Sequence, residues 1–209
     1  MSVSYKQTGG KMSKNKGSNK ENFEKTSKKF LEIARKEFIE YGYVQASTER
    51  IVEKSGMARG SLYYHYGNKE GIFRAVYQQV VEEFGERISD LLKDEKDPLI
   101  ALKKGCRFFY EECRRQDVRV IMLIEGIANI PYFERLKILE KHMIIHIRTL
   151  IEAIQEQEMF KEFNGQVIML FIYGMLAEAG RSIEYMGDID ENIKHFSDNI
   201  EIAIDKLAS

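Results

Sequence analysis

The chain has 209 residues, of which 44% are hydrophobic and 31% charged, and it contains two prolines and no tryptophan. This apolar content furnishes a core and excludes an intrinsically disordered protein. The longest apolar run, residues 167–177, is shorter than the roughly 20 residues that cross a bilayer, and the first residues lack the apolar core of a signal peptide. The composition therefore predicts a cytoplasmic protein with no membrane partner.

The net charge of -1 hides an uneven distribution of charge along the chain. Residues 1–20 contain five lysines and no acidic residue, and residues 25–74 are also basic, whereas the remainder from residue 75 is acidic. A basic front joined to an acidic rear suggests a polyanionic partner for the front alone. Residues 1–22 have almost no apolar side chains and predict a disordered basic tail, which either supports that contact or has no role.

Apolar residues recur at spacings of three and four through the rest of the chain, which predicts an all-α fold of about nine helices. The first is expected over residues 27–42, the second after Ser47, the third near Ala58 and the fourth over residues 69–93. Five further helices are expected to begin at the cap and breaker residues Asp97, Asp117, Pro131, Asn164 and Asp188 or Asp190.

Two short helices separated by a tight turn at Gly56 form a helix-turn-helix, whose second helix enters the major groove of DNA. Residues 28–76 resemble the DNA-binding domain of the TetR family of transcriptional regulators. The resemblance lies in a first helix that ends in Tyr41-Gly42-Tyr43 and a recognition helix that ends in Leu62-Tyr63-Tyr64-His65-Tyr66, followed by Lys69-Glu70. One departure is Ala58, where many relatives have a serine that caps the recognition helix.

The resemblance implies a three-helix DNA-binding domain at residues 23–70 and an effector-binding and dimerisation domain at residues 71–209. It further implies a homodimeric repressor that leaves a palindromic operator in double-stranded DNA when an unidentified small-molecule effector binds. A DNA-binding dimer without an effector is the alternative. An enzyme is not expected, because the sequence has no phosphate loop, dinucleotide fingerprint or nucleophile elbow.

Residue types in the motif suit contact with DNA. Hydroxyls and cations bind phosphates, which the resemblance assigns to Thr48, Tyr64 and Lys69, while base edges are read from the recognition helix. Gly60 allows close approach of the helix backbone to the groove. The predicted DNA-binding residues are Ser47, Thr48, Arg59, Gly60, Ser61, Tyr63, Tyr64, His65 and Lys69.

Polar residues inside apolar runs mark the candidate effector pocket, because a buried charge needs a partner. Glu125 lies in such a run, and Arg107 and Arg181 are expected near it, where they either orient a polar ligand group or pair with one another. The aromatic and methionine candidates, taken singly, are better explained as core. The tentative pocket residues are Arg107, Phe108, Met122, Glu125, Phe133, Met143, Tyr173 and Arg181.

Residues 167–177 are apolar on all sides of their helix, which predicts burial in part against a second subunit. Stripes on this helix and on the last one favour a four-helix bundle across a two-fold axis, with an ordinary internal helix pair as the alternative. The expected interface residues are Ile168, Phe171, Met175, Met186, Phe196 and Ile200.

Cysteine and histidine spacings give weaker signals. Cys106 and Cys113 are seven residues apart on one expected helix, about 10 Å at ~1.5 Å per residue, so they cannot bridge each other within it. His142 and His146 have a spacing that suits a metal, but the residues between them exclude the metalloprotease motif. No metal and no other cofactor are predicted.

Overall fold

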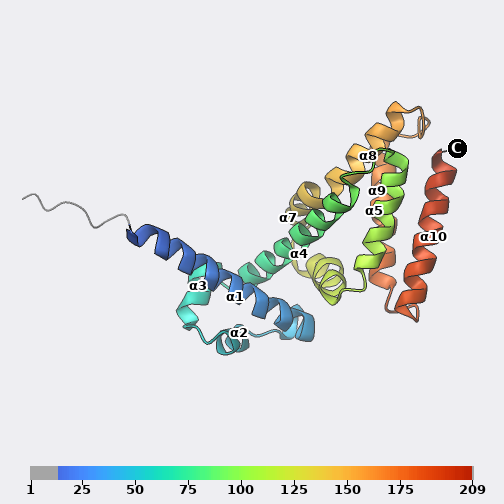
Figure 1. The fold of residues 1–209 in the computed structure, drawn as a ribbon. Helices are drawn as coiled ribbons and strands as arrows, with labels where there is room; N and C mark the ends of the chain where they lie inside the picture. The colour runs from blue at the N-terminus through green and yellow to red at the C-terminus, as the bar shows by residue number, and fades with distance from the viewer. Residues whose placement is uncertain (1–13, 209) are drawn as a thin grey trace, which may run out of the picture.

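The computed structural model describes residues 14–208, which form helices joined by short connections (Figure 1). Within this range the helices make nine continuous segments, because η1 runs directly into α6 and α7 runs through η2 into α8. The predicted all-α fold is confirmed for these residues. None of their helices has the length and apolarity that a membrane span requires. Residues 1–13 of the expected tail lie outside the described residues.

The first helix, α1 (Lys14–Gln45), begins well before the expected start at residue 27. The predicted tail is therefore wrong for residues 14–22, which are helical. Phe23 explains part of the extension, because its ring lies 4.0 Å from the ring of His65 on α3, a tertiary contact that no single-helix pattern reveals. Gly42 has the left-handed value φ +67° and ends the regular helix as predicted, with a short turn after it.

The front of the molecule consists of α1, α2 (Thr48–Ser55) and α3 (Arg59–Tyr66), which pack with the start of α4 (Lys69–Leu92). Phe30, Phe38, Ile51, Leu62 and Phe73 are fully buried at their junction. The rings of Phe38 and Phe73 meet edge to face with centroids 4.9 Å apart. This core fixes α3 against α1 and α4.

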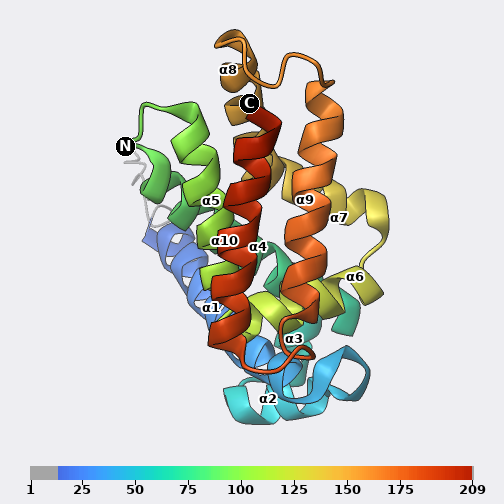
Figure 2. The same cartoon turned by 90° about the vertical axis from the view of Figure 1, so that its right-hand side faces the viewer.

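The rear of the molecule consists of longer helices, with α9 and α10 side by side on one face (Figure 2). Asp97, Asn164 and Asp188 accept backbone N–H groups at helix starts, so the predicted caps hold and Asp188, not Asp190, begins the last helix. The elements are α5 (Pro98–Glu112), η1 (Asp117–Glu125), α6 (Gly126–Asn129), α7 (Tyr132–Leu139), η2 (Glu140–Ile144), α8 (Ile145–Glu156), α9 (Gly165–Ser182) and α10 (Ile189–Ala208).

Helix α4 joins the two parts, packing against α1 and α3 in front and against α5, α7, η1 and η2 behind (Figure 1). Arg35 on α1 strengthens the junction: its guanidinium donates to Glu83 on α4 at 2.8 and 2.9 Å and also pairs with Asp117 in η1. The expected boundary after residue 70 falls in the first turn of α4. Front and rear therefore share one continuous helix.

Candidate nucleic-acid interface and ligand cavity

Local sequence sets the geometry of the turn between α2 and α3. The Ser47 hydroxyl accepts the backbone N–H groups of Glu49 and Arg50 and caps α2. Gly56, at φ +65°, ends α2 in the left-handed conformation that favours glycine. Ala58 begins α3 without a side-chain cap, as the sequence predicts. The tight turn orients α3 so that one of its faces is exposed to solvent.

The outward face of α3 carries a cation and two aromatic side chains. Arg59 donates to Glu49 at 3.2 Å and to the hydroxyl of Tyr63 at 3.3 Å, and Tyr64 is 80% exposed. A Cβ at Gly60 would meet nothing within 4 Å, so packing within the chain does not require this glycine. Ser61 is half-buried beside them. The exposed side chains supply a cation and hydroxyl groups of the kinds that bind nucleic-acid backbone and bases.

His65 lies on the side of α3 that faces α1, where its ring packs against Phe23 and Phe30. Burial lowers the pKa of His65, which favours the neutral ring. The Tyr66 hydroxyl hydrogen bonds to Ser27 at 2.7 Å. The expected packing role of Tyr66 agrees with this contact, while His65 is a packing residue in the structure rather than part of the exposed face. A histidine one residue after Tyr64 faces about 100° away on a helix, which explains the difference.

Lys69 stands at the start of α4 and close to the turn after α1. Its ammonium donates to the backbone oxygen of Val44 at 2.9 Å and lies 4.9 Å from the centre of the Tyr43 ring. Burial, followed by the charge of Arg50, lowers the pKa of Lys69. Thr48 lies nearby at the first turn of α2 and is half-buried. Lys69 thus already has a hydrogen-bond partner within the protein, whereas the exposed Tyr64 makes ring contacts with Phe23 and His65.

A buried carboxylate, that of Glu37, joins α1 to α2, and the sequence pattern did not predict it. Glu37 is fully buried and accepts hydrogen bonds from Arg50 at 2.6 Å, Lys54 at 3.0 Å and the Ser47 amide at 3.1 Å. Glu37 lies three residues after the apolar Ala34, which is also buried, so helical spacing could have placed position 37 on the inward side of α1. Arg50 and Lys54 are therefore oriented around Glu37 at the edge of the candidate interface.

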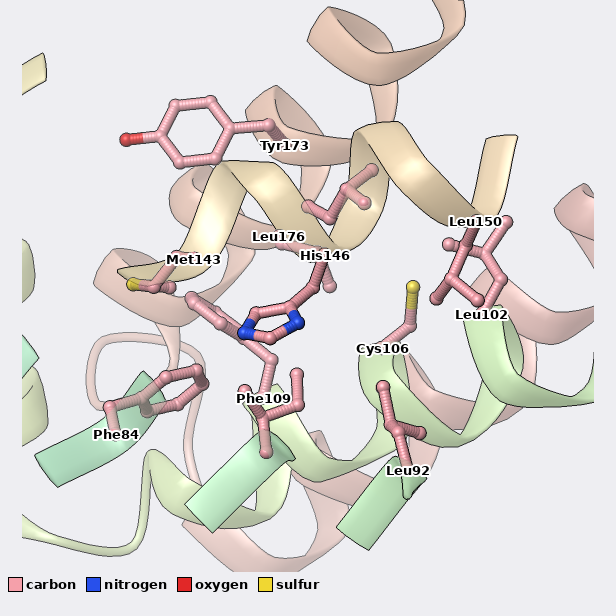
Figure 3. Close-up of a pocket in the computed structure, with 13 residues that line it drawn as sticks. Phe84, Leu92, Leu102, Cys106, Phe109, Met143, His146, Leu150, Tyr173 and Leu176 are labelled. Atoms are coloured by element: carbon pink, nitrogen blue, oxygen red, sulfur yellow. The ribbon is translucent and has the colours of Figure 1, made fainter. Parts of the chain in front are cut away.

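An apolar cavity lies in the rear of the molecule between α4, α5, α8 and α9 (Figure 3). Its volume is only about 30 Å³, little more than one water molecule occupies. Phe84, Leu92, Leu102, Cys106 and Leu176 contribute to its walls. His146 is the polar exception, and its Nε2 lies 3.2 Å from the hydroxyl of Ser89 on α4. The walls suit an apolar group, which enters only if the surrounding helices separate.

Two predicted pocket residues, Met143 and Tyr173, line this cavity. Met122 is buried in η1 and Phe108 is half-buried against Phe84, so both belong to the core. Phe133 is 76% exposed on α7 and cannot line an internal pocket. The lining residues from α4 escaped prediction because their apolar spacing is the same as that of an ordinary core helix.

The three charged candidates do not converge. Arg107 pairs with Asp198 and Glu201 on α10, Arg181 pairs with Glu178 on its own helix, and the Glu125 carboxylate accepts from Asn129 at 2.8 Å. The expectation of a shared polar cluster is therefore wrong. Helical spacing placed each residue correctly on its own helix, but the partner of Arg107 comes from a helix about 90 residues away in the chain.

Cys106 and His146 both line the apolar cavity, whereas Cys113 and His142 do not. Burial raises the pKa of both Cys106 and Cys113 to about 12, which disfavours the reactive thiolate. His142 lies 3.6 Å from Glu82, whereas His146 faces Ser89. Across residues 14–208, no three metal-ligating side chains of the His, Cys, Asp and Glu types come together.

The outer face of α9 and α10 exposes several large apolar side chains (Figure 2). Phe171 is 61% and Met175 40% exposed on α9, and a groove between the two helices has Tyr110 and Phe196 among its lining residues. Ile168 and Ile200 are buried within the protomer, although Ile200 also lines this groove, and their assignment to an interface stays a prediction. Met186 is exposed but follows the end of α9 at Ser182, in a turn rather than on the predicted stripe.

Comparisons with known proteins agree with this architecture. The HTH-type transcriptional repressor AcnR of Corynebacterium efficiens is 37% identical over 60 residues, which is 29% of this chain and 32% of that protein. The chain thus matches about a third of the length of the first curated relatives. A TetR-family transcriptional regulator from Pectobacterium atrosepticum superimposes with a TM-score of 0.75 at 26% identity, over 90% of this chain and 96% of the other.

A lower-identity structure has the same fold. FadR of Bacillus subtilis, in complex with stearoyl-CoA, gives a TM-score of 0.71 at 20% identity, over 84% of this chain and 96% of that chain. The family model for bacterial regulatory proteins of the tetR family matches residues 30–76, and the tetracyclin repressor-like C-terminal domain matches residues 99–207. Because the second match alone spans more than half of the chain, the protein belongs to the tetR family of bacterial regulatory proteins.

Proposed function

We propose that the protein is a DNA-binding transcriptional repressor that acts as a homodimer and leaves a palindromic operator when a small-molecule effector binds. The observation that carries this proposal is the course of α4. Its first turns pack with the helix that presents Arg59 and Tyr64, and its later turns supply Phe84, Ile88 and Leu92 to the apolar cavity. One helix therefore belongs both to the candidate DNA interface and to the candidate effector site.

The exposed face of α3 supports the DNA-binding part of the proposal. Tyr64 is 80% exposed, and Arg59 on the same helix forms an exposed ion pair with Glu49 and a hydrogen bond to the exposed Tyr63. Water competes strongly for such a pair, so Arg59 is available to a nucleic acid at little cost. Because no side chain fills the space around Gly60, the wall of a DNA groove can come close to the backbone of α3.

The exposed apolar face of α9 and α10 supports the homodimer. Val167, Leu170, Phe171 and Met175 on α9 and Ile202 on α10 are all at least 40% exposed. Soluble monomers rarely expose so many large apolar groups in one place. A two-fold axis through this face would place two copies of α3 on one side of the dimer, the arrangement that a palindromic operator needs.

The near-closed cavity supports the effector. The cavity volume of about 30 Å³ is far below that of ordinary ligand pockets, so we expect a ligand to displace α4, α8 or α9 when it binds. Displacement of α4 moves the attached α3, and a change in the separation of two recognition helices weakens simultaneous docking to both half-sites. The presence of stearoyl-CoA in FadR of Bacillus subtilis, which has the same fold, supports a ligand-binding role for the rear domain.

Selection of tight-binding duplexes from a random-sequence pool tests the proposal. We expect an enriched palindrome whose affinity falls steeply with salt concentration. Tyr64→Ala should weaken binding to all duplexes alike, whereas Arg59→Ala should change the enriched sequence. Lys93→Ala, which removes an exposed charge just after α4, is the control and should bind as the wild type does. An enriched sequence that both α3 variants bind like the wild type would contradict the assignment.

A further inference from the structure

Arg135 on α7 stands apart from the other arginines of the described residues. Each of the others forms an ion pair with a carboxylate, whereas Arg135 has none. Its side chain is half-buried, and its Nε is buried without a hydrogen-bond partner. Taking a guanidinium out of water without an anion is unfavourable, so the position of Arg135 calls for an external partner.

Arg135 lines a pocket of about 220 Å³, here named the basic pocket, between α7, η2, α8 and α9. Tyr132, Glu140, Arg148 and Tyr173 also line it, together with apolar side chains of η2 and α9. Glu140 and Arg148 pair with each other, which leaves the charge of Arg135 uncompensated. The guanidinium of Arg135 lies 5.6 Å from the centre of the Tyr132 ring. The basic pocket therefore presents one cation that has aromatic neighbours but no carboxylate partner.

A second buried polar group lies beside Arg135. Tyr77 on α4 is fully buried, and its hydroxyl has no hydrogen-bond partner among the described residues. Burial raises the pKa of Tyr77, Tyr173 raises it further, and the charge of Arg135 acts in the opposite direction. Tyr173 in turn interacts with Arg135, and both line the basic pocket. Tyr77 and Arg135 each have a buried hydrogen-bonding atom without a partner.

The basic pocket adjoins the apolar cavity through Tyr173, which lines both. In Figure 3 the Tyr173 hydroxyl points away from Cys106 and Leu102. We propose that the basic pocket binds the carboxylate of a small organic acid, whose apolar body enters the apolar cavity past Tyr173. Arg135 forms the ion pair, and the hydroxyl of Tyr173, which lines both spaces, donates a hydrogen bond from α9. This ligand is the effector of the proposed function.

Titration calorimetry with octanoate and with 1-octanol, on the full chain without DNA, tests this site. Octanoate should bind roughly tenfold or more tightly than the neutral alcohol, because only the carboxylate forms charge-assisted hydrogen bonds with Arg135. Arg135→Gln should abolish that preference while leaving the affinity for 1-octanol unchanged. Arg135→Lys, which keeps the charge, should restore part of it. Lys137→Gln removes an exposed charge from the same helix and should behave as the wild type.

NMR of octanoate labelled with ¹³C at the carboxyl group gives a second readout. The pKa of the bound carboxylate should fall below that of the free acid in the wild type but not in Arg135→Gln. Equal affinities for octanoate and 1-octanol, no binding of either, or an unchanged preference in Arg135→Gln would each overturn the site. Because these measurements involve no DNA, they distinguish a failure of the carboxylate site from a failure of the proposed repressor function. Octanoate that binds at Arg135 but leaves operator affinity unchanged would refute octanoate-linked release from DNA, not the site.

Discussion

At the scale of single residues, Glu37 shows how a buried charge defines the front domain. Burial raises its pKa, but hydrogen bonds from Lys54, the Ser47 amide and Arg50 together hold the pKa below the ordinary glutamate value. The carboxylate therefore stabilises the folded state at pH values above about 4.3, the unfolded pKa. This contribution is lost as the pH falls through the lower pKa of the folded state.

Glu37→Gln tests this interpretation. The variant should lose about 1–3 kcal/mol of unfolding free energy at pH 7, because Arg50 and Lys54 lose their shared partner but can still be hydrated. The difference from the wild type should shrink as the pH falls below about 4.3, because position 37 of the unfolded wild-type chain then takes up a proton before the folded state does. Urea unfolding at pH 7 and at pH 3.5 measures both values, with the exposed Glu53→Gln as control. A difference that stays constant with pH would contradict the role of the charge.

Residue-scale features that depend on neighbours in the chain could be predicted from the sequence. The caps at Ser47 and Asp97 and the left-handed Gly56 follow from rules that involve a few consecutive residues. Partners of long side chains could not be predicted, because they depend on which helices pack together. Arg107 meets α10 and His65 meets α1, and neither contact leaves a pattern within its own helix.

At the scale of elements, glycines allow α4 to pack closely against the rear helices. A Cβ at Gly85 would come within 2.5 Å of the backbone oxygen of His142 in η2, and one at Gly126 within 2.3 Å of the Tyr77 ring on α4. The π-helical turns of η1 and η2 occur in these same contact regions. The sequence predicted continuous helices here but not the wider turns, because an extra residue per turn is stabilised by tertiary packing rather than by local propensity.

The ion pairs of Arg35 predict energetic coupling between front and rear. Arg35 and Asp117 have side chains that are 17% and 11% exposed, so their interaction is little screened by water. A double-mutant cycle with Arg35→Met and Asp117→Asn, read by urea unfolding, should give a coupling of about 1–3 kcal/mol. The exposed pair Arg59 and Glu49 provides the comparison and should show no measurable coupling. Additive effects of the Arg35 and Asp117 substitutions would mean that this contact does not join the two parts.

At the scale of the whole molecule, the face of α9 and α10 predicts a dimer that forms at micromolar concentration. Phe171→Glu places a charge on the exposed apolar face and should yield monomers that no longer bind a palindromic duplex tightly. Leu91→Glu, on an exposed position of α4 away from this face, should remain dimeric. Sedimentation velocity distinguishes the two states. A wild-type protein that sediments as a monomer at this concentration would refute the prediction.

The small volume of the apolar cavity affects the rates of ligand binding and release as well as the affinity. A molecule that fits only after helices separate must wait for that opening, so its observed association rate should level off as its concentration rises. Departure requires the same opening, which makes residence long even where affinity is moderate. A regulator built in this way responds slowly to a brief pulse of its signal and retains the response after the pulse has ended.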